Sequence, residues 1–156
     1  MKTILTTTLL AGLLCASSAP ARIGEDVAQI ETRYGKPVKP GDVVAPATVA
    51  HEYFKNGITI IVQFHDGRAQ CETFARGQHE ALTPAEIETL LAANAAGKIW
   101  SKVRDRGSDK FWKLDGGDLL ADYDAFNERL TVINAQFQEK SNALKAEKEK
   151  KNLGGF

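Results

Sequence analysis

Cysteine is nearly absent from this sequence of 156 residues, which has two cysteines in all. Cys15 lies in an apolar N-terminal stretch and Cys71 in the body of the chain. If the N-terminal stretch is removed, one thiol is left, and one thiol cannot form an internal disulfide. A disulfide-stapled fold is therefore excluded, and a packed core of one domain or two very small ones is expected.

Net charge is absent as well, because 20 lysines and arginines balance 20 aspartates and glutamates. A chain without net charge has no overall electrostatic attraction to nucleic acid or to an anionic membrane surface. We therefore expect neither of these as a partner. The composition is otherwise ordinary for a globular protein, with 43% hydrophobic residues.

Long apolar runs are missing except near the start of the chain, where residues 1–21 have the features of a secretory signal peptide. Lys2 supplies the positive charge, residues 4–15 are mostly apolar, and Ala19-Pro20-Ala21 fits the small-x-small cleavage rule. The apolar stretch is too short for a stable membrane anchor. We expect cleavage before Arg22 and an exported protein, periplasmic or extracellular, without a transmembrane segment.

Motifs of common catalytic centres are also missing. There is no Gly-x-Ser-x-Gly, no phosphate-binding loop and no dinucleotide fingerprint. The three histidines, His51, His65 and His79, do not pair with one another or with a cysteine at the spacing of a zinc site. The densest acidic group, which comprises Asp118, Asp122, Asp124 and Glu128, lacks the glycine placement of a calcium loop. We predict no catalytic residue, no metal and no cofactor.

Two turn signals are present in residues 51–76 and organise the centre of the chain. Asn56-Gly57 and Asp66-Gly67 tolerate the positive φ angles of two-residue hairpin turns, and they separate three runs rich in β-branched and aromatic residues. These signals predict a three-stranded antiparallel meander. If both turns hold two residues, His51 pairs with Val62 across the first turn, and Ile60 pairs with Thr73 and Phe64 with Ala69 across the second.

This register divides the meander into two faces, because successive strand residues point to opposite sides. The inward face is apolar and holds Ile58, Ile60, Val62 and Phe64. The other face is mostly polar, but Phe54, Ile61 and Phe74 lie near one another on it. We interpret these three side chains as a partner-binding surface, with packing against another part of the chain as the alternative.

Cys71 falls on the inward face in the same register, two strands away from His51. The first interpretation is a buried small hydrophobe. A catalytic thiol would need exposure and a neighbouring base, and this is the one Cys/His pairing that the register offers. The alternative function is therefore a small exported enzyme that uses Cys71 with His51, or acidic residues between Asp118 and Asp124.

A short helix is expected before the meander. Residues 25–34 have apolar side chains at helical spacing, and Gly35 is suited to end the helix. Residues 36–49 contain three prolines, which predicts an extended connector with a short edge strand at residues 42–44.

A second helix is expected to begin at Thr83. Thr83 caps the helix, Pro84 takes the first helical position and Glu86 completes a capping box. Four less regular strands are predicted after this helix, at residues 99–103, 110–114, 119–123 and 129–134. From residue 138 onward the chain is highly charged, which indicates a solvated helix or a flexible tail.

A weak internal repeat suggests how these elements combine. Residues 28–35, AQIETRYG, parallel residues 85–92, AEIETLLA, and each segment precedes a set of strands. The predicted fold class is α+β, with two helix-plus-antiparallel-meander units in tandem that can join into one continuous sheet with both helices on one face. The corresponding regions are a signal peptide (1–21), a first unit (22–80), a second unit (81–137) and a charged tail (138–156).

The helix that ends in RYGKP, followed by a meander, resembles the SmpA/OmlA (BamE-like) family of outer-membrane assembly lipoproteins over residues 24–76. The tandem arrangement resembles the β-lactamase inhibitor protein group over residues 24–137. Both resemblances imply a helix-backed sheet, and the second implies a sheet face that binds protein. Leu14 before Cys15 does not make a lipobox and the inhibitor's disulfides cannot form, so anchoring, inhibition and individual site residues do not transfer.

The predicted function is a non-catalytic protein-binding or envelope-assembly module of an exported protein. Its partner is expected to be another protein that docks on the open sheet face around Phe54, Ile61 and Phe74.

Overall fold

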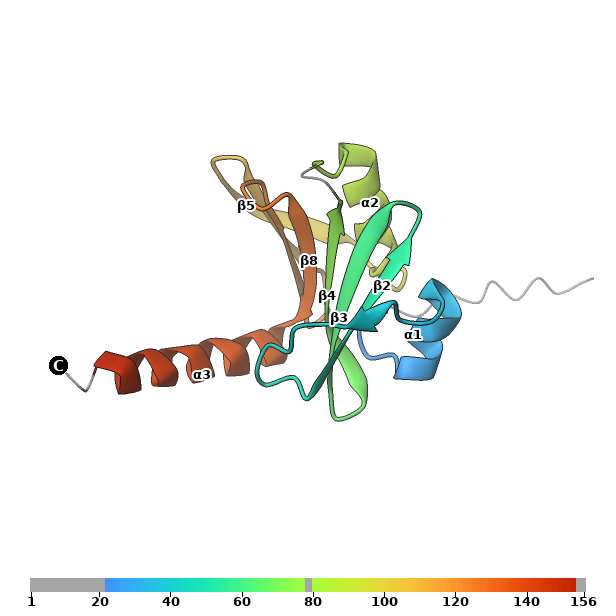
Figure 1. The fold of residues 1–156 in the computed structure, drawn as a ribbon. Helices are drawn as coiled ribbons and strands as arrows, with labels where there is room; N and C mark the ends of the chain where they lie inside the picture. The colour runs from blue at the N-terminus through green and yellow to red at the C-terminus, as the bar shows by residue number, and fades with distance from the viewer. Residues whose placement is uncertain (1–21, 78–79, 154–156) are drawn as a thin grey trace, which may run out of the picture.

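The structure is a computed structural model that describes residues 22–77 and 80–153. The predicted signal peptide therefore lies outside the described residues. Three helices and eight strands form an α+β fold within this part of the chain, and all eight strands belong to one antiparallel sheet (Figure 1). The predicted fold class is confirmed.

The helices are α1 (Val27–Tyr34), α2 (Pro84–Ala93) and α3 (Ala135–Leu153). The strands are β1 (Lys39–Pro40), β2 (Val49–Lys55), β3 (Ile58–His65), β4 (Arg68–Arg76), β5 (Trp100–Arg106), β6 (Asp109–Leu114), β7 (Leu119–Asp124) and β8 (Arg129–Asn134). They are ordered β1-β2-β3-β4-β8-β7-β6-β5 across the sheet, so β4 and β8 join its two halves.

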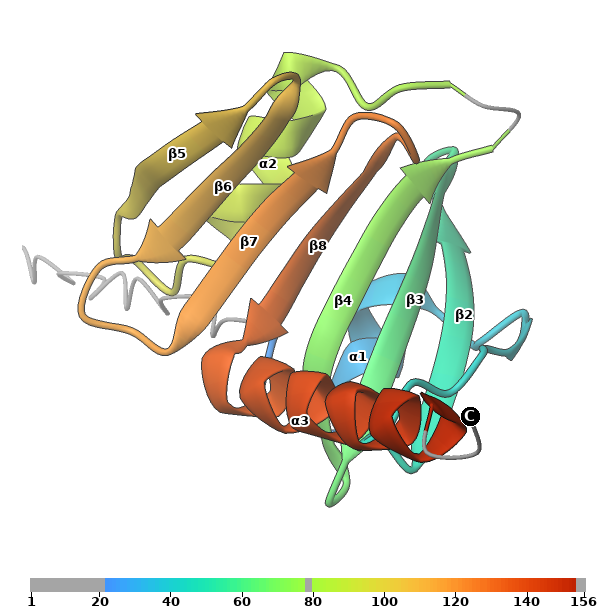
Figure 2. The ribbon, with the colours of Figure 1, turned by 90° about the vertical axis from the view of Figure 1, so that its left-hand side faces the viewer.

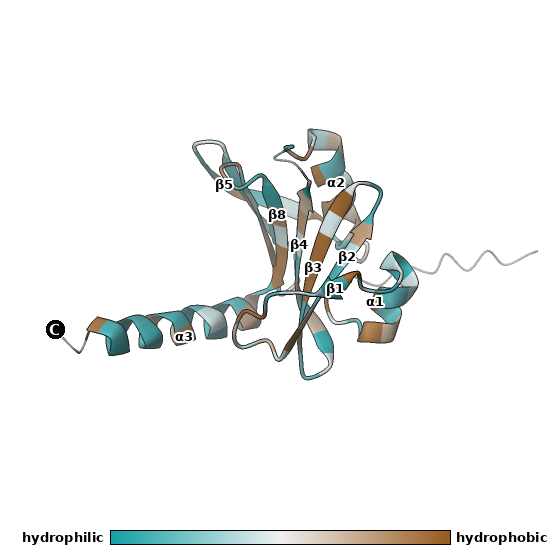
Figure 3. Ribbon diagram, in the orientation of Figure 1, coloured by the Kyte–Doolittle hydropathy of each residue, from teal (hydrophilic) through white to brown (hydrophobic). Residues whose placement is uncertain are grey.

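The helices are distributed unequally over the two sides of the sheet. α1 and α2 lie on one side, which we call the helix face (Figures 1 and 2). α3 continues directly from β8 and crosses one end of the other side, which we call the open face (Figure 2). Figure 3 shows that α3 is largely hydrophilic, and its residues beyond Ser141 are exposed through Leu153.

The helix starts follow the sequence signals closely. The Thr83 hydroxyl accepts from the Glu86 N–H, and the Glu86 carboxylate accepts from the Thr83 N–H, so the predicted capping box is confirmed. α1 begins two residues later than predicted, because Asp26 caps it through the Gln29 N–H. The edge strand lies at Lys39–Pro40 rather than at residues 42–44.

Both hairpin turns of the meander are confirmed. Asn56 and Gly57 have φ angles of 52° and 79°, and Asp66 and Gly67 have φ angles of 52° and 71°. These left-handed conformations are what Asn-Gly and Asp-Gly were expected to supply. The predicted pairing of His51 with Val62 across the first turn is also present.

The register of β4 differs from the prediction because of a β-bulge. Phe64 pairs with Ala69 as expected, but Gln63 pairs with Cys71, which leaves Gln70 as an extra residue in β4. One extra residue reverses the faces of every side chain beyond it. Ile60 therefore pairs with Phe74 and not with Thr73.

The bulge corrects three placements. Phe74 and Glu72 lie on the helix face, and Cys71 lies on the open face. The main core lies between the helix face and α1 with α2, and it includes Ile30 of α1, Leu90 of α2 and Leu130 of β8. Because both halves of the chain share this core and one sheet, separate tandem units are not confirmed.

Candidate functional site

A cleft of about 720 Å³ opens between α1 and α2 on the helix face. Its lining comes from four segments: Arg22 before α1; Thr32, Arg33 and Tyr34 of α1; Lys55, Asn56, Ile58 and Ile60 of the β2–β3 hairpin; and Ala85, Glu86, Thr89 and Leu90 of α2. A volume of this size lies in the range of about 300–1,000 Å³ that holds small ligands. We therefore treat this cleft as the candidate site of the helix face.

The segment before α1 is fixed against β4, and this places Arg22 at the cleft. The Gly24 N–H donates to the Ala69 carbonyl and the Ala69 N–H donates to the Glu25 carbonyl, and the N···O distance is 2.8 Å in both hydrogen bonds. The buried Glu25 carboxylate accepts from Arg33 Nε at 2.7 Å, which ties the same segment to α1. This contact raises the pKa of Arg33.

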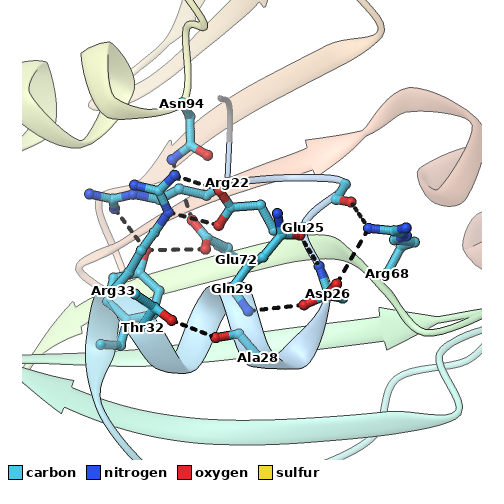
Figure 4. A network of polar contacts seen from close by, with 12 residues as sticks. Arg22, Glu25, Asp26, Ala28, Gln29, Thr32, Arg33, Arg68, Glu72 and Asn94 are labelled. Carbon is cyan, nitrogen blue, oxygen red and sulfur yellow. Dashed lines mark hydrogen bonds and ion pairs between the residues drawn. The ribbon is translucent and has the colours of Figure 1, made fainter. Parts of the chain in front are cut away.

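A buried polar network lies next to the cleft (Figure 4). Glu72 is 0% exposed, between Val62 and Val132 in neighbouring strands. The Tyr34 hydroxyl donates to Glu72 Oε1 at 3.1 Å, and Asn94 Nδ2 lies 3.4 Å from Glu72 Oε2. A carboxyl group is thus held in the core by two neutral hydrogen-bonding partners.

Burial raises the pKa of Glu72 to about 7, because the core disfavours its charged form. The Arg22 charge and the hydrogen bonds from Tyr34 and Asn94 act in the opposite direction without cancelling the effect. Arg22 reaches this network by donating from Nη1 to the Tyr34 hydroxyl at 2.7 Å.

Two atoms of this network are buried without a hydrogen-bond partner in the described part of the chain, Arg22 Nε and Asn94 Oδ1. Buried polar atoms are usually paired, so each of these has an unused capacity for a contact. The sequence pattern does not predict this network, because the expected register of the meander puts Glu72 on its polar face, and Arg22 and Asn94 belong to no motif.

The open face carries a continuous row of paired residues across all eight strands. From β1 to β5 in sheet order the row reads Lys39, Glu52, Ile61, Thr73, Thr131, Asp122, Phe111 and Arg104. The six residues of this row from Glu52 to Phe111 are all half-buried, so their side chains are partly accessible to solvent. The row mixes apolar, hydroxyl and carboxylate groups at its centre and has charged groups at its ends.

The predicted partner-binding residues are not brought together. Phe54, which is 58% exposed, and Ile61 lie diagonally on the open face as expected. Phe74 is 0% exposed on the helix face, where it packs in the core. The three-residue surface is therefore not formed.

The predicted pairing of Cys71 with His51 is not formed either. Cys71 lies on the open face and is 7% exposed, beneath Ala47 and Phe137. His51 lies on the helix face, with its ring 5.5 Å from the Phe64 ring. Burial raises the pKa of the Cys71 thiol to about 12, so a thiolate is strongly disfavoured.

We expect Cys71 to resist a thiol reagent such as 5,5′-dithiobis(2-nitrobenzoate) in the native protein at pH 8 and to react at once in denaturant, because only unfolding exposes and ionises it. The absorbance of the thionitrobenzoate that the reagent releases measures the rate of labelling in the native and in the denatured protein. Native labelling as fast as that of the denatured chain would show that the thiol is accessible.

The remaining predicted candidates do not form a metal site. The described residues contain no group of three or more His, Cys, Asp or Glu side chains placed to hold a metal ion. Asn127 Nδ2 donates a hydrogen bond to Asp124 Oδ2 at 2.6 Å, and this contact lowers the pKa of the Asp124 carboxyl. His79 lies outside the described residues.

Comparisons with known proteins add little to this geometry. No protein family and no curated protein matches the chain. A crystal structure of an extracellular protein containing an SCP domain, from Bacillus anthracis strain Ames, is similar with a TM-score of 0.42 and 12% identity, over 86% of this chain and 52% of that one. This chain thus spans about half the length of that protein. The SmpA/OmlA and β-lactamase inhibitor resemblances stay predictions.

Within the described residues, none of the helices combines the length and the apolar character needed to span a membrane.

Proposed function

We propose that this chain is an exported, non-catalytic module that binds another protein on the open face of its sheet. The observation that carries the proposal is the row of paired side chains that crosses the sheet on the side without α1 and α2, and that is half-buried from Glu52 to Phe111 (Figure 2). A sheet normally buries one face and leaves the other in water, so the composition of the second face indicates its use.

The row has the mixed character of a protein interface. Ile61 and Phe111 supply apolar area, and Thr73 and Thr131 supply hydroxyl groups beside one another. Interfaces of this kind are about as apolar as ordinary surface and gain specificity from their polar groups. Eight strands at about 4.8 Å spacing span about 34 Å, which is wide enough for a standard interface.

One end of the open face is already covered by the chain itself. The Val44 N–H donates to Gln63 Oε1 at 3.1 Å and Gln63 Nε2 donates to the Asp42 carbonyl at 2.8 Å, so the connector folds over β3. Phe137 of α3 covers Cys71 at the same end. The free surface is therefore the part that contains the row and Phe54.

Asp122 indicates the chemistry of the partner. It lies in the centre of the row between Thr131 and Phe111, and partial burial raises the pKa of its carboxyl. A partner that covers Asp122 must supply a cation or hydrogen-bond donors, since an unpaired buried carboxylate is costly. The partner we infer is thus a protein surface with a basic group at its centre.

The test is capture from an exported-protein extract with two variants that make the surface more positive at different places. Thr131→Arg adds one positive charge beside Asp122 on the open face, and Glu88→Lys, which changes the charge by two, is the control on the exposed side of α2. We expect a partner held by the parent to be retained by Glu88→Lys and weakened at least tenfold by Thr131→Arg. A partner that Thr131→Arg still holds at full affinity would exclude the open face.

A further inference from the structure

We propose that the cleft between α1 and α2 is a second binding site, distinct from the open face, and that it takes a small amphipathic monoanion such as an aliphatic carboxylate. The proposal rests on three features of the cleft: an apolar floor, two cations that form no ion pair among the described residues, and a buried Arg22 donor that has no hydrogen-bond partner in the same part of the chain.

The floor can hold an apolar body. Ile58 and Ile60 of β3 and Leu90 of α2 line it, and the volume of about 720 Å³ accommodates a chain of roughly ten carbons. These side chains belong to or pack against the main core, which gives the floor a fixed shape. An apolar ligand there would remove hydrophobic surface from water on both sides.

The charges of the cleft favour an anion. Of the residues that line it, Arg22, Arg33 and Lys55 are cationic and Glu86 is anionic. Glu86 is bound by Arg76, and Arg33 is bound by Glu25, so these two charges are compensated. The described contacts of Arg22 and Lys55 are to neutral groups: the Tyr34 hydroxyl for Arg22, and the Arg33 carbonyl for Lys55.

Arg22 is the residue best placed to hold a carboxylate. Its guanidinium lies 5.2 Å from the centre of the Tyr34 ring, a cation–π contact that fixes its plane. Nη1 donates to the Tyr34 hydroxyl, whereas Nε is buried and has no partner within the described residues. A guanidinium has donors in a planar fork that suits a carboxylate, and Arg22 lines the cleft, so we place the anionic head of the ligand at this residue.

These features together determine the ligand class. An anionic head at Arg22 and Lys55 with an apolar body over Ile58, Ile60 and Leu90 matches a carboxylate with a single tail. The site is on the opposite side of the sheet from the row that contains Thr131, so the two sites can be tested separately.

The experiment is calorimetric titration of the protein after export, with decanoate below its micelle-forming concentration as the probe. Decyltrimethylammonium, which has the same tail and the opposite charge, is the ligand control. Thr89→Trp fills the cleft from an exposed position of α2, and Glu88→Trp adds the same side chain at an adjacent exposed position that does not line the cleft. Circular dichroism confirms that each variant is folded.

We expect saturable binding of decanoate with one site per chain, at least tenfold weaker binding of the cationic probe, and at least a tenfold loss with Thr89→Trp. Glu88→Trp should bind within twofold of the parent, and Arg22→Gln should weaken decanoate about tenfold. Absence of decanoate binding by the parent, equal binding by Thr89→Trp, or equal binding of the cationic probe would each overturn the proposal. Partner capture by the open face should be unchanged in Thr89→Trp.

Discussion

Replacing Phe74 with serine is expected to lower the free energy of unfolding by about 4 kcal/mol, whereas Phe54→Ser should change it by less than about 0.5 kcal/mol. Phe74 is 0% exposed and pairs with Ile60 and Leu130 on the helix face. Serine there would leave a cavity and a buried hydroxyl group. Phe54 is 58% exposed on the open face, so its loss removes little buried surface.

Urea denaturation of the parent and of each single variant measures both values on one scale. A loss of less than about 1 kcal/mol for Phe74→Ser would place this side chain at the surface, contrary to the bulged register. The comparison also shows why a joint Phe54 and Phe74 variant cannot test binding: its loss of stability would remove the folded protein.

The second large effect is expected at Glu72. Its pKa is about 7 in the folded protein and near the ordinary value of 4.5 in the unfolded chain. The folded state therefore binds more protons than the unfolded state between these values, and stability decreases as pH rises through this interval. The stabilising effect of the protonated group is fully present below about pH 4.5 and is lost above about pH 7, with a total on the order of 3 kcal/mol.

Glu72→Gln should remove this dependence, because glutamine is neutral at every pH and has nearly the same shape. It keeps an acceptor for the Tyr34 hydroxyl, which is the shorter of the two hydrogen bonds that Glu72 accepts. We expect the variant to be about 3 kcal/mol more stable than the parent at pH 8 and nearly equal to it at pH 4.5.

Denaturant unfolding of both proteins between pH 4.5 and pH 8 gives the two curves, and Glu88→Gln on the exposed side of α2 is the control for loss of one carboxylate. Glu86, the pKa of which is lowered to about 2 in the folded state, is present in both proteins, so its contribution cancels in the difference between their curves. A Glu72→Gln curve that falls with pH as steeply as the parent curve would contradict the assignment.

Local signals predicted most of the elements, because turns and caps depend on a few neighbouring residues. Asn56-Gly57 and Asp66-Gly67 fixed both hairpins, and the capping box at Thr83 fixed the start of α2. The four strands of the second half also occur where β-branched and aromatic runs indicate them, although β5 continues to Arg106.

The register of β4 could not be predicted, because a bulge depends on tertiary contacts and not on turn residues. The Ala69 N–H donates to the Glu25 carbonyl and the Ala69 carbonyl accepts from the Gly24 N–H, and Gln70 is the extra residue of the bulge. This single residue moved Phe74 from the predicted binding surface into the core and Cys71 away from His51.

The cleft and the buried network could not be predicted from the sequence, because they too depend on contacts between distant parts of the chain. Arg22, Tyr34, Glu72 and Asn94 come from four separate segments and share no motif. A glutamate in an alternating strand is assigned to the solvent side by default, and only the bulge places Glu72 inside. The open face, in contrast, was correctly expected to be mostly polar around Phe54 and Ile61.

The position of β8 has a consequence for how this chain reaches its native state. Within the described residues, β8 is synthesised after the other seven strands, yet it occupies the middle of the sheet, between β4 and β7. Until residues 129–134 are available, both halves expose an unpaired strand edge, which is a template for aggregation. Closure also depends on contacts between distant parts of the chain, which makes it slow relative to hairpin formation. A nascent chain that has been synthesised only as far as β7 therefore exposes the edges of β4 and β7, and pairing of β8 with both strands joins the two halves of the sheet.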